Sequence, residues 1–246
     1  MNIDKEKCIA CKACYPYCPQ GAISLVPWEN GKKKSEVSQS TCVECGACLR
    51  SGICPKDAIF MVDLEWPRSI RHRFSSPYAA PLPGVKGAPP PPDPKTNEVN
   101  CRITKGLTAV VVEVGRPGVS ASFADIEKIC ISLAQSGVAF DPGSSVTGLM
   151  VDPAAGNLQP DILGERVMHA MIHYTCSADG LRASLGALRE VSGLIDTVFS
   201  IGFSNLLDDH GVAPAIAIVE QAGFAVKPHG KTNVGLTSTR KSEVRS

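Results

Sequence analysis

The stretches CIACKACYPYCP at residues 8–19 and CVECGACLRSGICP at residues 42–55 decide the N-terminal fold of this chain. Together they hold eight of its eleven cysteines, in two runs of four, and a proline closes each run. Each run contains three cysteines at the spacing C-x2-C-x2-C. A short turn with this spacing wraps one iron–sulfur cube and brings a thiolate to three of its irons. The spacing therefore predicts two iron–sulfur sites.

Eight cysteines could also serve in two other ways. Disulfide frameworks belong to oxidising compartments, whereas residues 1–7 are charged and have none of the features of a secretory signal. Structural zinc sites favour C-x2-C pairs that lie far apart, not a triplet followed by Cys-Pro. Reduced thiols and oxygen-sensitive clusters predict a cytoplasmic protein.

Residues 1–63 resemble the bacterial two-[4Fe-4S] ferredoxin domain. The first run fits the family pattern, while the second has five residues between Cys48 and Cys54 where three are usual. The sequence 19–23 (PQGAI) matches 55–59 (PKDAI), which indicates two copies of one half-unit. The resemblance implies two [4Fe-4S] clusters, with the fourth cysteine of each run crossing to the other cluster. The implied ligands are Cys8, Cys11, Cys14 and Cys54 for the first cluster, and Cys42, Cys45, Cys48 and Cys18 for the second.

Length and charge limit the number of domains and the kinds of partner that this chain can have. With 246 residues it is long enough for two domains, and its net charge of +1 gives no strong field toward nucleic acid or a membrane surface. No apolar run approaches the ~20 residues of a membrane-spanning helix. Ferredoxins of this type are usually acidic, so a near-neutral cluster domain favours a fixed protein partner; drift in surface charge is the alternative.

The chain reads as α+β, with a linker between two domains. Nine of its nineteen prolines lie between Pro67 and Pro94, so residues 64–106 are expected to form an extended Pro-rich linker or arm. Residues 66–74 within it are basic with interleaved aromatics. They fit a solvated spacer or an arm along a partner subunit, and the lack of a recognition fold argues against nucleic acid. Residues 107–236 are expected to form an α/β sandwich and residues 237–246 a polar tail.

The expected elements of the second domain alternate. Strands are predicted at 107–114, 146–151, 195–201 and 224–226, and helices from an N-cap at Ser122 to Gly137, over 181–191 and from Pro214 through Val219. Residues 162–176 fit either a helix or a strand. The alternation predicts a sheet with helices on one face, an α/β sandwich of ferredoxin-like topology.

Other candidate chemistry in the second domain is weaker. Residues 225–232 match a phosphate-binding loop loosely, without the following helix. The turn at 115–118 carries Arg116 at the end of a strand, where α/β folds place ligands. His169 and His173 have the spacing of a zinc pair but lack its glutamate, and Cys101, Cys130 and Cys176 are isolated.

These features predict an electron-transfer protein that is a subunit of, or a dedicated donor to, a larger oxidoreductase. No catalytic residue is assigned, and the oligomeric state is left open. One alternative is an iron–sulfur reductase whose second domain binds a small substrate. Another is a redox-sensing regulatory protein.

Overall fold

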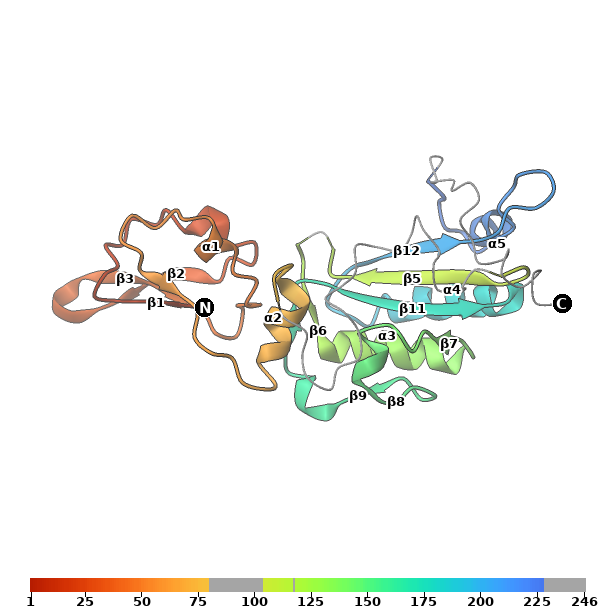
Figure 1. Cartoon of the computed structure of the whole chain (residues 1–246), viewed down its shortest axis with the longest axis horizontal. Helices are drawn as coiled ribbons and strands as arrows, with labels where there is room; N and C mark the ends of the chain where they lie inside the picture. The colour runs from red at the N-terminus through yellow and green to blue at the C-terminus, as the bar shows by residue number, and fades with distance from the viewer. Residues whose placement is uncertain (80–103, 117, 228–246) are drawn as a thin grey trace, which may run out of the picture.

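The structure, a computed structural model, describes residues 1–79, 104–116 and 118–227. One buried cluster, with residues from Met1 to Ile59, marks an N-terminal lobe, and a second, with residues from Val110 to Val219, marks a C-terminal lobe. Figure 1 shows the two lobes at opposite ends of an elongated molecule, with helix α2 between them. Among the described residues, no helix is long and apolar enough to cross a membrane.

The N-terminal lobe is built from very short elements around its cysteines. Its elements are β1 (Asn2–Ile3), β2 (Ile23–Pro27), β3 (Lys33–Val37), α1 (Ala47–Arg50) and β4 (Ile59–Phe60). β1 pairs antiparallel with β4, and β2 with β3. Asn30 and Gly31 turn the β2–β3 hairpin with positive φ angles of 55° and 72°, as the Asn-Gly sequence predicts. Cys8, Cys14, Cys42 and Cys48 lie in the small core with a few aliphatic side chains.

Helix α2 (Ser69–Ser75) replaces part of the expected extended linker. Ile70 is fully buried and Phe74 is 6% exposed, and both belong to the core of the C-terminal lobe. The Phe74 ring meets the Phe123 ring edge to face, with 5.5 Å between centroids. Residues 70 and 74 are four apart, so a helix puts both on one face. Residues 80–103, with most of the Pro-rich stretch, lie outside the described residues.

The C-terminal lobe contains a sheet of β5 (Thr108–Val114), β7 (Ala139–Phe140), β11 (Ala170–Cys176) and β12 (Phe199–Ser204). Across the described part of this lobe, the sheet has four strands in the order β12-β5-β11-β7, and every neighbouring pair is antiparallel. β5 lies between β12 and β11, and five of its seven residues are threonine or valine, β-branched residues that are enriched in strands.

Helices α3 (Phe123–Gln135) and α4 (Ala178–Val191) pack in one core with Val110, Val112 and Ile172 of the sheet, and α5 (Ala215–Gln221) joins them. The helix start predicted at Ser122 is confirmed, since its hydroxyl accepts a hydrogen bond from the Asp125 amide at 3.1 Å. The lobe is therefore a mixed α+β domain with an antiparallel sheet and helices on the face that carries these side chains.

Several strand predictions were wrong in position. The strand predicted at 146–151 forms only at its end, as β8 (Met150–Asp152), which pairs with β9 (Asn157–Leu158) outside the four-stranded sheet. The edge of that sheet is β7, because Phe140 pairs with Tyr174 of β11. β6 (Ala121–Ser122) pairs with β10 (Arg166–Val167). The ambiguous segment 162–176 forms β10 and β11, the strand expected at 195–201 begins at Phe199, and residues 224–226 form no strand. Short apolar runs do not reveal their pairing partners, which tertiary contacts decide.

Candidate iron–sulfur centre

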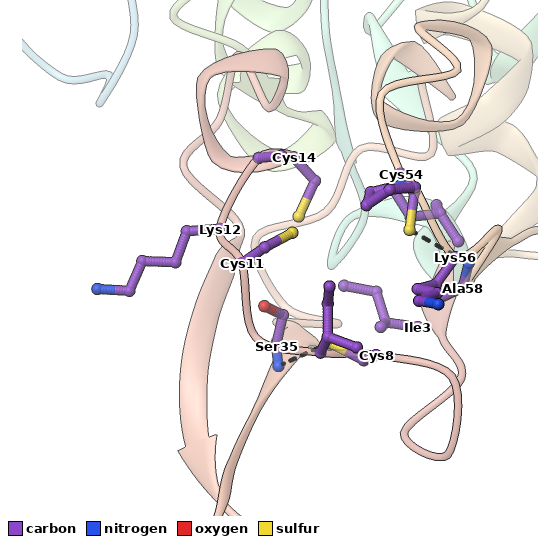
Figure 2. A pocket seen from close by; sticks show the side chains of 13 residues that line it. Ile3, Cys8, Cys11, Lys12, Cys14, Ser35, Cys54, Lys56 and Ala58 are labelled. Atoms are coloured by element: carbon purple, nitrogen blue, oxygen red, sulfur yellow. Dashed lines mark hydrogen bonds between the residues drawn. The ribbon is translucent and has the colours of Figure 1, made fainter.

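The first cysteine run folds into a loop that directs thiols to one side. Ala10 and Lys12 take positive φ angles of 59° and 61°, which reverses the chain between successive cysteines. Cys8, Cys11 and Cys14 line a pocket together with Cys54, which comes from the second run. Figure 2 shows the sulfur atoms of Cys11, Cys14 and Cys54 turned toward this pocket. The structure thus brings together the four cysteines predicted for the first cluster.

The cysteines of this first group also interact electrostatically. Burial raises the pKa of the Cys14 thiol, and charges on Cys11, Cys54 and Cys8 act in the same direction. Burial on its own would also raise the pKa of Cys8, but amide hydrogen bonds from Ser35 and Ala10 outweigh it and lower that pKa. Several thiolates in one partly buried place repel one another, and a cluster of iron ions relieves this repulsion.

The other four cysteines lie together around the second run. Burial raises the pKa of Cys48 to about 11, and the neighbouring charges of Cys45, Cys18 and Cys42 add to the increase. Cys42 and Cys48 are buried, and Cys18 and Cys45 are half-buried. Three of these cysteines come from one run and Cys18 comes from the other. The arrangement mirrors the first group.

The backbone repeats between the two halves. Glu44 and Gly46 have positive φ angles of 54° and 72°, at the same offsets from Cys42 that Ala10 and Lys12 have from Cys8. The amides two residues after the first cysteine of each run donate to its sulfur, Ala10 to Cys8 at 3.4 Å and Glu44 to Cys42 at 3.5 Å.

The fourth cysteines repeat as well. Ala22 donates its amide hydrogen to Cys18 Sγ at 3.1 Å, and Ala58 donates to Cys54 Sγ at 3.3 Å. Both donors come four residues after the cysteine. Amide hydrogens aimed at sulfur stabilise the thiolate and tune a bound cluster. The donor set, eight cysteine sulfurs with amide donors in a largely apolar setting, fits two [4Fe-4S] clusters.

The enlarged loop of the second run changes the local backbone. Between Cys14 and Cys18 the chain forms a 3-10 turn at Tyr15–Tyr17, whereas after Cys48 it completes helix α1 and then turns at Gly52 with φ 61°. The two additional residues are accommodated in this helical turn, and Cys54 still reaches the first group.

Helix α2 packs against the second run. Arg71 Nη1 donates to the Cys42 carbonyl oxygen at 2.7 Å, and its Nε donates to the Glu165 carboxylate of the C-terminal lobe. His72 Nδ1 lies 2.7 Å from the Glu44 carbonyl oxygen. Sequence reasoning missed these contacts; the signal that could have revealed the helix is the i, i+4 spacing of Ile70 and Phe74.

Glu44 is a buried carboxylate between the cysteines of the second run. Burial opposes its ionisation, but hydrogen bonds from the ammonium group of Met1 and from Arg68 outweigh this and lower the pKa of Glu44. Arg68 Nε and Nη2 lie 3.0 Å and 2.5 Å from the carboxylate oxygen Oε1. The ion pair anchors the start of α2 to the loop that carries Cys42 and Cys45.

A second contact between the lobes is made by Gln20, two residues after Cys18. Gln20 Nε2 donates to the Gly118 carbonyl oxygen at 2.8 Å and lies 3.6 Å from Met168 Sδ. The turn predicted at 115–118 therefore touches the N-terminal lobe. Gly115 has φ 83°, and a Cβ atom there would lie 2.9 Å from the Met168 carbonyl oxygen, so glycine fits this turn. Arg116 Nη1 lies 3.8 Å from the Glu113 carboxylate.

Those of the remaining candidates that the structure describes do not come together in a site. His173 lies in β11 and His169 just before it, and four residues of extended chain separate them by roughly 13 Å. Cys130 is in the core on α3, where burial raises the pKa of its thiol far above the usual range. Burial raises the pKa of Cys176 to about 11. Cys101 and most of the loose phosphate-loop match at 225–232 lie outside the described residues.

Comparison with known proteins agrees with this geometry. The 4Fe-4S dicluster domain family matches residues 7–58. An uncharacterized ferredoxin of Methanocaldococcus jannaschii is 39% identical over 59 residues, which are 24% of this chain and 73% of that protein. Pyruvate synthase subunit PorD of the same organism is 40% identical over 63 residues, which are 26% of this chain and 66% of PorD.

A third relative matches a shorter share of its own length. It is a subunit of the ion-translocating oxidoreductase complex of Methanosarcina acetivorans, 42% identical over 52 residues, which are 21% of this chain and 17% of that subunit. This chain thus covers less than two thirds of both oxidoreductase subunits. No solved structure gives a significant match.

The cysteine groups and the family match define an iron–sulfur protein of the ferredoxin class, with an electron-transfer domain for two [4Fe-4S] clusters. The chain belongs to the 4Fe-4S dicluster family through residues 7–58, and its C-terminal lobe is assigned to no family.

Proposed function

We propose that this chain transfers electrons as a subunit of, or a dedicated donor to, a larger oxidoreductase. The observation that carries the proposal is the placement of its two cysteine groups. The group with Cys11 opens to solvent, while the group with Cys42 lies against α2, which is packed into the C-terminal lobe. One end thus suits exchange with an outside carrier and the other suits exchange toward the second lobe or a subunit held by it.

The ligand assignment is part of the proposal. Cys8, Cys11, Cys14 and Cys54 hold the first cluster, and Cys42, Cys45, Cys48 and Cys18 hold the second. The shared pocket of the first four and the mutual electrostatic influence of the second four support this division. A bound [4Fe-4S] cluster supplies the ability to accept and release one electron at a time. The amide donors at Cys8, Cys18, Cys42 and Cys54 favour the charged, ligating form of sulfur.

The domain layout is proposed as a cluster domain at 1–63, a connecting segment at 64–106, an α/β sandwich at 107–236 and a tail at 237–246. A ferredoxin-like topology for the sandwich is supported by its element order β5-α3-β7-β11-α4-β12 and by the strand order β12-β5-β11-β7. In this layout, the connecting segment contains α2, whose Arg71 contacts both lobes.

The partner is proposed to be a protein oxidoreductase subunit in the cytoplasm. Two of the relatives are named as subunits, of pyruvate synthase and of an ion-translocating oxidoreductase complex. Their similarity is confined to the cluster domain, so it supports the use of such a domain within an assembly and leaves the reaction of this assembly to experiment.

A second candidate function is an iron–sulfur reductase whose C-terminal lobe binds a small substrate. The contact between Gln20 and Gly118 favours it, because it brings the 115–118 turn, which carries Arg116, against a residue two positions after Cys18 of the second group. Purified holoprotein would then carry a flavin spectrum or turn over a substrate with dithionite as the only electron source. Purified protein with neither a flavin spectrum nor substrate turnover would argue for the electron-transfer subunit.

The main proposal is tested by redox titration of anaerobically purified protein, followed by electron paramagnetic resonance. Both clusters should be reduced by a low-potential donor and reoxidised by a co-purifying partner protein. Clusters that stay redox-silent across the physiological range would be structural, and the proposal would fall.

A further inference from the structure

The two cysteine groups differ in their access to solvent. Cys11 is the exposed thiol among the eight, and Ile9 beside it is 56% exposed. Cys8 and Cys14 are as buried as Cys42 and Cys48 of the second group, so the difference lies in Cys11 and in α2, which packs against the Cys42 loop. Because electron transfer weakens steeply with distance, an outside protein reaches the first group more readily than the second.

The opening of the first group is lined by cations. Lys12 and Lys56 border the pocket, and none of the described residues that line it is an aspartate or a glutamate. Both lysines are exposed, and Figure 2 shows Lys12 extending away from the pocket. Lys34 is a third cation near this group, with Nζ 2.6 Å from the Cys8 carbonyl oxygen. We call Ile9, Lys12, Pro55 and Lys56 the basic rim.

The carboxylates nearest in sequence to the basic rim do not line the pocket. Asp4 accepts a hydrogen bond from the Glu6 amide at 2.9 Å and lies 3.8 Å from Lys7 Nζ. Glu6 and Asp57 are exposed but do not line the pocket. Ile9 and Pro55 line the same pocket and add apolar surface to the two cations. Apolar surface together with charged side chains is a composition found at protein interfaces, which combine an apolar core with a polar rim.

We propose that the basic rim is the docking surface for an acidic electron-carrier protein. This inference rests on the electron-transfer function proposed above and adds the entry point and the charge of the partner. One electron passes between the carrier and the chain near Cys11, so one protein is oxidised by one electron as the other is reduced, and no bond forms or breaks. Complementary charge accelerates the encounter and leaves the complex short-lived, as a carrier requires.

The test uses full-length holoprotein and flavodoxin as an acidic carrier probe. Flavodoxin is reduced in advance and mixed with oxidised protein in a stopped-flow instrument at increasing NaCl concentrations. The variant is the double substitution Lys12→Glu and Lys56→Glu. The control is Lys32→Glu and Lys33→Glu, which makes the same charge change at two exposed positions of the β2–β3 hairpin.

We expect the bimolecular rate of the wild type to fall at least about tenfold as salt rises from low to high concentration. At low salt the rim variant should be slower by about tenfold, and the hairpin control should stay within about twofold of the wild type. A wild-type rate that ignores salt, or equal losses in the rim and control variants, would overturn the docking surface.

Reduction by dithionite distinguishes a failure of the docking surface from a failure of the proposed electron-transfer function. Dithionite needs no docked protein, so it should reduce the clusters of the wild type and of both variants to the same extent. If dithionite reduces all three proteins but flavodoxin does not distinguish them, only the docking surface is wrong. Clusters that dithionite cannot reduce would remove the electron-transfer function and the inference together.

Discussion

The guanidinium group of Arg71 donates to the carbonyl oxygen of Cys42 at 2.7 Å while also pairing with Glu165 of the C-terminal lobe. Arg71 is only 6% exposed, so its charge acts through protein rather than water. One side chain therefore connects a cysteine loop of the second group to the other lobe, and its charge lies beside the site where an added electron would reside.

Substitution of Arg71 should change the redox potential of the second cluster. A nearby positive charge stabilises the reduced, more negative cluster, so Arg71→Gln should lower this potential by tens of millivolts. Glu165→Gln should shift it in the opposite direction, because the charge of Arg71 then loses its counterion. Potentiometric titration followed by electron paramagnetic resonance measures both. Arg182→Gln, at an exposed ion pair on α4, is the control; equal shifts in all three variants would contradict the role of Arg71.

Single cysteine substitutions should separate the two clusters. Cys54→Ser should impair the cluster of the first run, and Cys18→Ser that of the second, although each residue lies in the opposite run. Each variant should keep roughly half of the iron, or an altered cluster with a changed spectrum at one site only. Iron analysis and Mössbauer spectroscopy measure this. Loss of the cluster of its own run in either variant would refute the crossed assignment.

Removal of the Phe74 ring should destabilise the C-terminal lobe although α2 precedes it. Phe74 is buried against Phe123, so Phe74→Ala should lower the free energy of unfolding by roughly 3–5 kcal/mol. Urea unfolding of the full chain, followed by circular dichroism, measures the loss. Val151→Ala removes a side chain that is 60% exposed and should have little effect. A Phe74→Ala protein as stable as this control would show that α2 contributes nothing to the core.

Asp125 should make the C-terminal lobe more stable as pH rises through the acid range. Burial opposes its ionisation, but hydrogen bonds from Ser122 and Lys128 outweigh it and lower the pKa of Asp125 from its ordinary value of 3.8. The folded state then binds fewer protons than the unfolded state, so the stabilisation is present above that value and is lost as the pH falls through the lowered pKa.

Comparison with Asp125→Asn isolates this effect. The wild type should be more stable by about 1 kcal/mol near neutral pH, and the difference should shrink below about pH 4. Both proteins carry the same cysteines, so acid loss of the clusters affects them alike. Urea midpoints measured at several pH values give the difference, and a constant difference down to about pH 3 would argue against a charged Asp125.

The correct structural predictions came mostly from residues that lie close together in the sequence. The Asn-Gly turn of the hairpin and the Ser122 cap depend on residues close in sequence, and both were predicted correctly. The strand expected at 146–151 forms only as β8 at residues 150–152 and pairs with β9, because the place in the main sheet beside Tyr174 is taken by Phe140 of β7. Helix α2 was missed because the surrounding prolines outweighed the two apolar residues that define its buried face.

The cysteine spacing by itself determined that this protein binds iron–sulfur clusters, because the ligands of one cluster lie within a turn and their chemistry is set by residue type. Only the tertiary structure decided how the two cysteine groups face. Ile70 and Phe74 insert into a core assembled from distant strands and helices, and this packing holds α2 against the loop of Cys42. The first group is left open at Cys11, since no such element packs over it in the described residues. Burial and contacts between distant segments set this asymmetry, and no short stretch of sequence encodes it.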